Sequence, residues 1–488
     1  MYFLGYDIGS SSVKASLLDG NSGKIVASAA SAEQEILAPK PGWAEQDPEM
    51  WWKNVKAVTA KLISDSGVKA ENIQAIGIAY QMHGLVVVDK DQKVLRPAII
   101  WCDSRAAEIG QKAFTSLGEK QCQENFLNSP GNFTASKLKW IKENEPKVYE
   151  RIHKIMLPGE YVAMRLSGQI QTTASGLSEG IFWNFKEQNI ADSLLKHYAI
   201  EKDLLPEVVE LFSVQSELSV SAVKELGLKA GTKISYRSGD QPNNAFALNV
   251  LNPGEVAANA GTSGVIYAVT DKNNYDQRSR VNTFVHVNNS KKNIRNGILL
   301  CVNGTGILNS WLKKTLNISS YEKMNELAAQ APPGSEGLLF HPFGNGAERI
   351  LENAHPGAQL KNLQLNIHNT SHLCRAAQEG IVFALNYGFQ IMKEMGVSPK
   401  VIRAGEANLF LSPVFREAFA TVTETTLELY NTDGSQGAAR GAAIGAGFYS
   451  NFTEAFQKLE KRMSVEPNKK LMSNYKDAYA NWLQHLNK

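Results

Sequence analysis

Tyr2-Phe3-Leu4-Gly5-Tyr6-Asp7-Ile8-Gly9-Ser10-Ser11-Ser12-Val13-Lys14-Ala15-Ser16-Leu17-Leu18 opens the chain with an apolar segment, a turn of small residues and an alternating segment. This pattern predicts two strands, 2–8 and 13–18, joined by the turn 9–12. Main-chain N–H groups and hydroxyls in such a turn can bind phosphate oxygens. The turn is not a P-loop, because Gly-x4-Gly-Lys-Ser/Thr is absent. Taken alone, a plain hairpin explains it equally well.

The pattern begins again after the Pro-Gly junction at 253–254. Residues 255–271 again give strand, turn and strand, with the turn at Gly261-Thr262-Ser263-Gly264. Aligned on Gly9 and Gly261 without gaps, the two segments match at three further pairs: Ser11 and Ser263, Val13 and Val265, Asp19 and Asp271. We therefore predict an internally duplicated architecture whose two turns grip the phosphates of a nucleotide. Chance similarity of two hairpins is the alternative.

Two aspartates stand where predicted strands end. Asp7 can hold Mg²⁺ beside a phosphate bound at the first turn. Asp240 follows the predicted strand 233–236, and Gln241 and two asparagines follow it, a set suited to holding a polyol. Its carboxylate can accept a hydroxyl proton during phosphoryl transfer. Asp240 can equally be the N-cap of a helix at 242–248.

Three further loops carry polar or small residues. Gln81-Met82-His83-Gly84 lies between two predicted strands, where hydrogen bonds to a sugar are plausible, although a lone histidine is more often structural. Asp103 and Arg105 follow Trp101, and an internal salt bridge and a substrate contact are equally good interpretations of the pair. The turn 303–306, which ends at Gly306, can approach a nucleotide or simply cap the next helix.

Composition excludes several classes of protein. The 488 residues are 43% hydrophobic and 20% charged, with a net charge of +3, so two or three globular domains are expected and nucleic acid is not the expected main partner. Four dispersed cysteines indicate reduced thiols. The N-terminus lacks signal-peptide features, and no apolar run is long enough to span a membrane. We predict a cytoplasmic protein.

The order of elements is mixed. Strands are predicted at 24–29, 73–79 and 85–88, with a helix at 48–64 that Asp47 caps. The second half predicts helices at 372–395 and 413–424 and a helical tail at 451–488. This is not the regular βαβ alternation of a dinucleotide-binding fold.

Eleven motifs in order resemble the FGGY carbohydrate kinases, and within them the xylulokinases. They are DIGSSSVK (7–14), PGWAEQDPEMWW (41–52), YQMHG (80–84), AIIWCDSR (98–105), TASKLKW (134–140), LPGEYVAMRLSG (157–168), SGDQ (238–241), NAGTSG (259–264), PFGNGAER (342–349), AAQEGIVFAL (376–385) and DGSQGAARGAA (433–443). The resemblance implies an α/β fold of two actin-like (ribonuclease-H-like) ATPase domains with a deep interdomain cleft. The expected domains are 1–248 on the sugar side and 249–488 on the nucleotide side.

The resemblance also implies roles for individual residues. Asp240 is expected to be the catalytic base, and Asp7 to be needed for catalysis beside Mg²⁺. The expected sugar contacts are Gln81, Met82, His83, Asp103 and Gln241. The expected ATP contacts are Ser10, Ser11, Ser12, Gly261, Thr262, Gly306 and Gly405.

The expected reaction is transfer of the γ-phosphoryl group of ATP to the 5-hydroxyl of D-xylulose, with Mg²⁺ as cofactor, no nucleic-acid or membrane partner, and a homodimer as an open expectation. Two departures bear on it. Asp240-Gln241 replaces the Asp-Asn common in xylulokinases, and Ala404-Gly405-Glu406 replaces the triple glycine of the nucleotide loop. The alternatives are a kinase for ribulose, glycerol or gluconate, and a nucleotide-driven binding protein of the actin or chaperone type.

Overall fold

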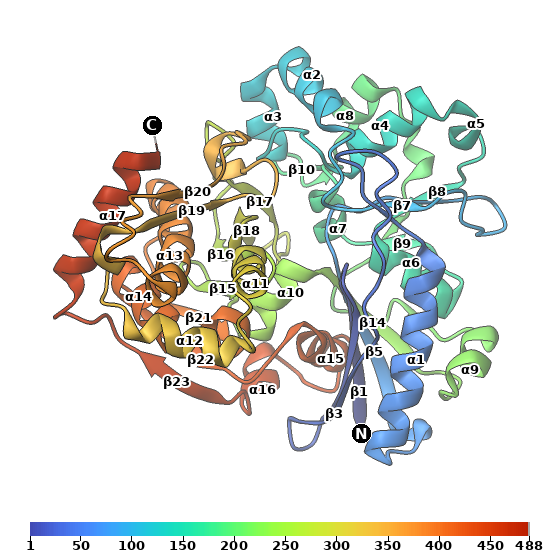
Figure 1. Cartoon of the computed structure of the whole chain (residues 1–488). Helices are drawn as coiled ribbons and strands as arrows, with labels where there is room; N and C mark the ends of the chain where they lie inside the picture. Colours follow the sequence, from blue (N-terminus) through green and yellow to red (C-terminus); the bar gives the residue numbers. More distant parts are fainter. Residues whose placement is uncertain (487–488) are drawn as a thin grey trace.

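The computed structural model describes residues 1–486, which form two mixed β-sheets flanked by helices (Figure 1). In the first sheet the strand order is β13-β14-β5-β1-β2-β3. The central strand β1 is antiparallel to β2 and parallel to β5, which is parallel to β14. The strands are β1 (Tyr2–Ile8), β2 (Val13–Asp19), β3 (Lys24–Ala30), β5 (Ile73–Tyr80), β13 (Ser216–Glu217) and β14 (Lys233–Gly239).

The second sheet repeats this arrangement in the order β17-β18-β16-β15-β21-β22-β23. Its central strand β15 is antiparallel to β16 and parallel to β21, which is parallel to β22. The predicted duplication is therefore present in the topology. The strands are β15 (Val256–Ala260), β16 (Gly264–Thr270), β17 (Asn282–Val285), β18 (Asn296–Val302), β21 (Val401–Gly405), β22 (Thr426–Tyr430) and β23 (Lys461–Val465).

The gapless alignment of the two hairpins is wrong by one residue after the turn. In the first hairpin Ile8 pairs with Val13, which leaves four turn residues. In the second, Ala260 pairs with Gly264, which leaves three. The counterpart of Val13 is therefore Gly264, one residue before the Val265 of the gapless alignment.

Helices cover the two faces of the first sheet differently. One face packs on α1 (Pro48–Ser66), α6 (Pro158–Ser167) and α9 (Val220–Leu226). The other face packs on α15 (Gly434–Gly445), which comes from the far end of the chain. At Gly77 an added Cβ would lie 2.0 Å from the carbonyl oxygen of Ala438, and at Gly5 it would meet α15 equally closely. Glycine in β1 and β5 thus permits close packing of strand and helix.

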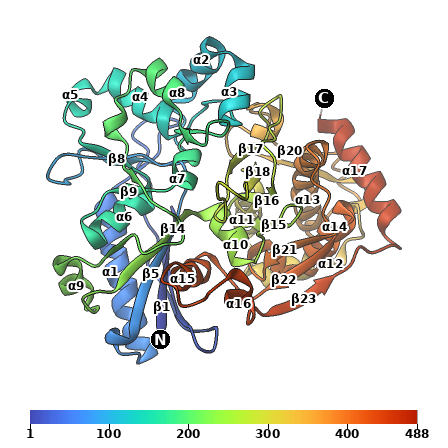
Figure 2. The same ribbon diagram turned by 180° about the vertical axis from the view of Figure 1, so that it is seen from behind.

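Helices of the second half cover one face of the second sheet, and its other face packs on the first half (Figure 2). The first group is α11 (Thr305–Thr315), α12 (Tyr321–Gln330), α13 (Thr370–Glu394), α14 (Pro413–Thr423) and α17 (Met472–Leu486). The first-half elements on the other face are α10 (Asp240–Ala247) and the helical region with α2 (Ala107–Leu117), α3 (Glu119–Phe126), α4 (Thr134–Asn144), α5 (Pro146–Tyr149), α7 (Ala174–Glu179) and α8 (Asp192–Tyr198). One apolar core therefore contains residues of both halves, among them Met82 and Phe284.

Short strand pairs complete the fold. They are β4 (Glu45–Gln46) with β7 (Ala98–Ile99), β6 (Val86–Val88) with β8 (Lys154–Met156), β9 (Gln171–Thr172) with β12 (Glu207–Val208), β10 (Trp183–Asn184) with β11 (Asn189–Ile190), and β19 (Leu339–Phe343) with β20 (Gly357–Lys361). The prediction of a helical tail is wrong in part, because α16 (Phe452–Phe456) is followed by β23 before α17 begins. Positions 487 and 488 of that prediction lie outside the described residues.

The division into domains 1–248 and 249–488 stays a prediction. Its boundary falls between α10 and β15, whereas α15 belongs by sequence to the second half and packs on the first sheet. Among residues 1–486, none of the helices has the length and apolar character that crossing a bilayer requires.

Candidate functional site

Asp7 and Asp240 lie at the same edge of the first sheet, where β1 and β14 end on either side of β5. Asp7 stands at the end of β1, and Asp240 directly follows β14. Burial raises the pKa of Asp240 to about 7, and the Asp7 carboxylate adds to the effect. Burial also raises the pKa of Asp7 to about 6, with Lys14 opposing and Asp433 reinforcing the shift. A pKa near neutrality suits a carboxylate that accepts a proton.

The alternative in which Asp240 caps the helix is wrong. The N-cap of α10 is Gly239, and Asp240 is the first helical residue. Its side chain hydrogen-bonds to Gln241, its neighbour along the helix. Gln241 therefore lies beside the carboxylate, which bonds to both the side chain and the main chain of Gln241.

A second helix terminus faces Asp7, and none of the sequence predictions assigns it a role. Asp433 caps α15 by accepting from the N–H of Gln436 at 2.9 Å. A Cβ added to Gly434 would lie only 2.4 Å from the Asp7 carboxylate. Asp433-Gly434 follows β22 just as Asp240 follows β14, a parallel that the duplicated topology makes visible.

The first turn presents unused hydrogen-bond donors. Gly9 N–H donates to the Ser12 carbonyl at 3.1 Å, and the side-chain amide of Gln46 donates to the Ser10 carbonyl at 2.7 Å. These two hydrogen bonds hold the main chain of the turn. Within residues 1–486 the hydroxyls of Ser10, Ser11 and Ser12 have no protein acceptor. These groups are free to bind phosphate oxygens.

The second turn contacts the third. Gly306 N–H donates to the Gly261 carbonyl at 3.0 Å, and Ile307 N–H donates to the Thr262 carbonyl at 3.2 Å. A Cβ on Gly306 would meet the Gly261 carbonyl at 2.1 Å, which explains the glycine. Gly405 ends the neighbouring strand β21 and lies against the carbonyl of Thr432. Three of the four predicted nucleotide contacts in this half are therefore in one cluster, and Gly405 lies one strand away.

Gln81 and Met82 are buried and contact residues next to the first turn and next to Asp240. Gln81 is 2% exposed and donates to Gln46 at 2.9 Å, the residue that holds the first turn. Met82 is 4% exposed, and a Cβ added to Gly239 would lie 2.7 Å from its side chain. Little of either side chain is accessible, and their predicted contacts with the sugar stay a prediction.

His83 presents one ring nitrogen for hydrogen bonding. Its φ of 60° is left-handed, and its Nδ1 lies 2.8 Å from the carbonyl of Glu179. A carbonyl only accepts, so Nδ1 carries the proton and Nε2 is an acceptor. Burial lowers the pKa of His83 to about 3, which keeps the ring neutral. Phe133 and Phe284 flank the ring, with centroids 4.8 and 5.2 Å away.

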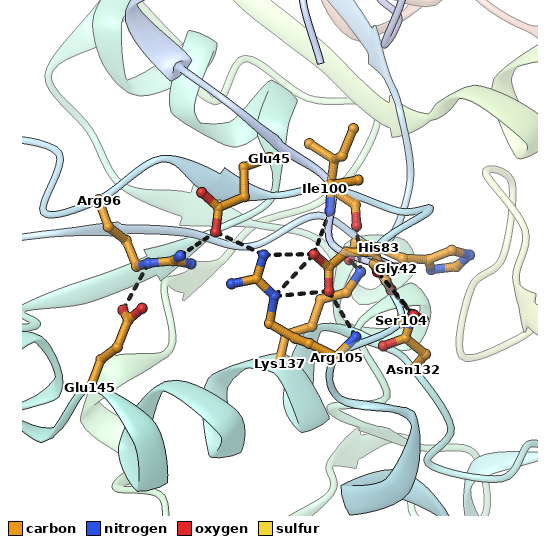
Figure 3. A network of polar contacts seen from close by, with 12 residues as sticks. Gly42, Glu45, His83, Arg96, Ile100, Ser104, Arg105, Asn132, Lys137 and Glu145 are labelled. Carbon is orange, nitrogen blue, oxygen red and sulfur yellow. Dashed lines mark hydrogen bonds and ion pairs between the residues drawn. The ribbon is translucent and has the colours of Figure 1, made fainter. Parts of the chain in front are cut away.

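Asp103 belongs to an ion-pair network beside His83, where it has a structural role (Figure 3). Asp103 is fully buried, bonds to the guanidinium of Arg105 through both carboxylate oxygens and accepts from Ala44 N–H at 2.6 Å. Arg105 also pairs with Glu45 at 2.7 Å and stacks on Trp43. The predicted sugar contact of Asp103 is thus corrected, because neither oxygen is free or accessible.

The same network fixes the main chain of His83. Lys137 is buried and donates to the carbonyls of His83 and Ile100 at 2.8 and 3.0 Å. Burial lowers the pKa of Lys137 to about 8. The imidazole of His83 points away from the network, toward the flanking aromatic rings (Figure 3).

Arg349 was not assigned from the sequence, although its motif was noted. Its guanidinium lies 5.5 Å from the centre of the Phe133 ring and donates to the Ser279 carbonyl at 3.4 Å. Within residues 1–486 no carboxylate pairs with it, and burial lowers its pKa to about 10. Arg349 is half-buried, and removing a cation from water without a counter-ion has a cost, so an anionic or strongly polar ligand would stabilise it.

Asp7 fits a magnesium ion that takes most of its ligands from a nucleotide. No group of three or more His, Cys, Asp or Glu side chains in the described chain is arranged to hold a metal. Mg²⁺ commonly binds through one or two carboxylates, with phosphates and water completing the octahedron. The carboxylates available here are Asp7 and Asp240, next to the first turn.

A surface concavity lies away from this site. It has a volume of about 730 Å³ and is lined by charged residues such as Asp89, Arg151 and His153, none of them a predicted site residue. The candidate site is therefore defined by its chemistry and not by this hollow.

Comparison with known proteins places the chain in a family. Residues 2–247 match the N-terminal domain of the FGGY family of carbohydrate kinases. The chain belongs to this family and is a carbohydrate kinase, an enzyme that transfers a phosphoryl group to a sugar-type acceptor.

Full-length relatives and solved structures agree. The xylulose kinase of Lactococcus lactis subsp. lactis is 30% identical over 508 residues, which cover 99% of this chain and 96% of that protein. The ligand-bound xylulose kinase structure from Lactobacillus acidophilus has a TM-score of 0.90 at 24% identity, covering 100% of this chain and 98% of that one. A gluconate kinase structure from Lactobacillus acidophilus has a TM-score of 0.89 at 25% identity, covering 100% and 97%. The predicted fold of two actin-like ATPase domains is confirmed.

Proposed function

We propose that this enzyme transfers the γ-phosphoryl group of ATP to D-xylulose, forming D-xylulose 5-phosphate. The observation that carries the proposal is that Asp240, whose pKa burial and Asp7 raise to about 7, directly follows Gly239, which lies against Met82 of the His83 loop. The similar proteins named xylulose kinase support the choice of sugar.

Each protein group has a defined task in the reaction. Nε2 of His83 accepts a hydrogen bond from a sugar hydroxyl and so orients the acceptor. Asp240 takes the proton of the 5-hydroxyl as its oxygen bonds to the γ-phosphorus and the bond to the β-phosphate oxygen breaks. The donors of the two glycine-containing turns stabilise the charge on the transferred group.

Residues of the second half would bind the nucleotide, and Asp7 would bind the metal ion. Gly261, Thr262 and Gly306 would contact the phosphates, and Gly405 the nucleotide, where absence of side chains permits close approach. Asp7 would hold Mg²⁺, which supplies positive charge to the phosphate oxygens when bound. Gln241 would contact the sugar beside Asp240.

A panel of sugars tests the proposal. ADP release is measured with D-xylulose, L-xylulose, D-ribulose, glycerol and gluconate at matched concentrations, with a sugar-free control. We expect kcat/KM for D-xylulose to exceed that for every other acceptor by at least about tenfold. If kcat/KM is higher for another acceptor, that acceptor and not D-xylulose is the substrate. If no acceptor increases ADP release, the result contradicts a sugar kinase.

Gluconate is the second candidate, on one observation. The unpaired guanidinium of Arg349 lies beside Phe133 and thus near the His83 ring, where it suits the carboxylate of an aldonate. The same panel separates the two sugars, since only gluconate brings a negative charge. Cytoplasmic location, a homodimer and the domain boundary at 248 remain predictions.

A further inference from the structure

Glu179 occupies a central place that neither the mechanism nor the sequence motifs use. It is the last residue of α7 and is 1% exposed. A Cβ added to Gly239, the residue before Asp240, would lie 3.1 Å from both carboxyl oxygens of Glu179. The side chain therefore lies between the loop that carries the catalytic base and the loop that carries His83.

Glu179 holds His83 at two points. Its main-chain carbonyl accepts from Nδ1 of the ring at 2.8 Å, and its carboxyl Oε2 accepts from the main-chain N–H of His83 at 3.3 Å. The first contact sets the ring tautomer and the second fixes a left-handed backbone that a histidine adopts at a cost. Lys137 fixes the carbonyl of the same residue from the opposite side.

The surroundings of the carboxyl group disfavour its charged form. Burial raises the pKa of Glu179 well above its usual range, and the carboxylates of Glu160 and Asp240 add to the effect. Tyr80 and Glu160 adjoin it, and the side chains of both are buried as well. Arg237, the buried cation of this region, is bonded to Gln171 and Gln215.

We propose that Glu179 is a positioning residue for the acceptor sugar, which acts by holding His83 so that Nε2 faces the substrate as a hydrogen-bond acceptor. The inference rests on the proposed function for the identity of the sugar, but not for the existence of the contact. Any acceptor bound at Nε2 requires the same orientation. The carboxyl group touches no reacting atom, so its loss should weaken sugar binding and spare ATP binding.

Two substitutions of similar volume test the carboxyl group. Glu179→Gln keeps an oxygen that accepts from His83 N–H and stays neutral, whereas Glu179→Met keeps the volume and removes the acceptor. We expect Glu179→Met to raise the KM for the sugar about tenfold with the KM for ATP within about twofold of the wild-type value. Glu179→Gln should leave both within about threefold. Equal effects of the two variants, or a parallel rise in the KM for ATP, would overturn the proposal.

A double-variant cycle shows whether Glu179 acts through His83. If it does, adding Glu179→Met to His83→Ala should change the sugar KM by no more than about twofold. If the double variant multiplies the changes in sugar KM of the two single variants, the proposal is overturned. Glu160→Gln is the matched control, because this neighbouring buried carboxyl bonds to Leu157 N–H and not to the His83 loop. It should leave the sugar KM within about twofold.

Further arms cover misfolding and a different substrate. If Glu179→Met fails to fold, Glu179→Asp withdraws the carboxyl by one methylene and should raise the sugar KM severalfold. An unchanged sugar KM in Glu179→Asp would overturn the proposal. All variants are assayed with the best sugar of the wild-type panel. A wrong sugar therefore shows in the wild type, and a wrong role for Glu179 shows only in the variants.

Discussion

At the residue scale, two carboxylates are held close together in a place that disfavours their charged forms. In the proposed mechanism Asp240 must be charged to accept a proton, yet burial and Asp7 raise its pKa to about 7. The active form is therefore lost as the pH falls below about 7. The same repulsion lowers stability at high pH, as is common where function requires an unfavourable arrangement.

The Asp240→Asn variant separates these two effects. We expect kcat to fall by a factor of about 10² to 10⁴, the usual contribution of a general base. Wild-type kcat/KM for the sugar should reach a plateau above about pH 7 and decline below it, which initial rates across pH 5–9 measure. A decline centred near pH 4 would contradict the raised pKa.

Thermal denaturation of the same variant checks the stability side. A carboxyl whose pKa is raised by folding stabilises the protein below its unfolded-state pKa and loses that contribution as the pH rises through about 7. Asp240→Asn should therefore raise the Tm at pH 8 by about 1 to 3 °C and have a smaller effect at pH 5. Variant and wild type are compared by circular dichroism at both pH values.

Sequence alone identified residues whose role depends on their neighbours along the chain. Asp7, Asp240 and His83 stand at strand ends or in short loops, where local pattern is informative. Glu179 and Arg349 were missed because their contacts come from elsewhere in the chain: Glu179 meets a residue 96 positions away. Asp103 was left open for the same reason, since local sequence cannot show whether Arg105 uses both of its oxygens.

At the element scale, the beginning of α15 controls the position of Asp7. Gly434 is the first residue of this helix, and its bare Cα lies against the Asp7 carboxylate. The helix is set close to the sheet because Gly5 and Gly77 remove side chains from the contact. A change at either contact is therefore expected to reach the site.

Gly434→Ala tests this coupling. Alanine favours the helix, so α15 should form normally, but the new methyl group would lie 2.4 Å from Asp7 and 3.1 Å from the amide oxygen of Asn244. We expect kcat to fall at least about tenfold with the Tm little changed, because Asp7 must move. Ser435→Ala, one residue on, is the control, since this serine bonds to Ser16 and Asp433 and not to Asp7. Unchanged kcat in Gly434→Ala would contradict a catalytic Asp7.

Elements with strong local patterns were predicted well, and weakly patterned ones were not. The first hairpin and α1, with Asp47 accepting from Glu49 N–H at 3.0 Å, match the sequence prediction. The tail was predicted as helix, but residues 461–465 form β23, whose only sheet neighbour within the described chain is β22. All but one residue of β23 are exposed, so no apolar alternation marks it as a strand.

At the scale of the whole molecule, the two halves are joined beside the sugar loop. Asn128, which is 2% exposed, donates to the carbonyl of Thr283 at 2.7 Å and accepts from Asn282 at 2.8 Å and from Thr283 N–H at 3.1 Å. These bonds link the segment after α3 to β17. The shared apolar core lies in the same region.

Asn128→Ala should loosen this junction. Three hydrogen bonds between the halves are lost and buried polar groups are left without partners, which costs about 2 to 4 kcal/mol of stability. Water then reaches the phosphates more easily, so sugar-independent ATP hydrolysis should rise severalfold relative to sugar phosphorylation. Asn144→Ala, on the exposed side of α4, is the control and should change neither quantity. If stability falls but the ratio of sugar-independent ATP hydrolysis to sugar phosphorylation is unchanged, Asn128 contributes only to folding.

The packing of α15 on β1 also governs how the chain can fold while it is being made. Ser16 of β2 bonds to Ser435 of α15, 419 positions later. At ordinary translation rates of about 5 to 20 residues per second, roughly 20 to 80 s separate the appearance of these two residues. Throughout that interval the glycine-containing surface of β1 and β5 that α15 covers lacks this helix. The growing polypeptide thus offers general chaperones a binding surface until α15 has left the ribosome.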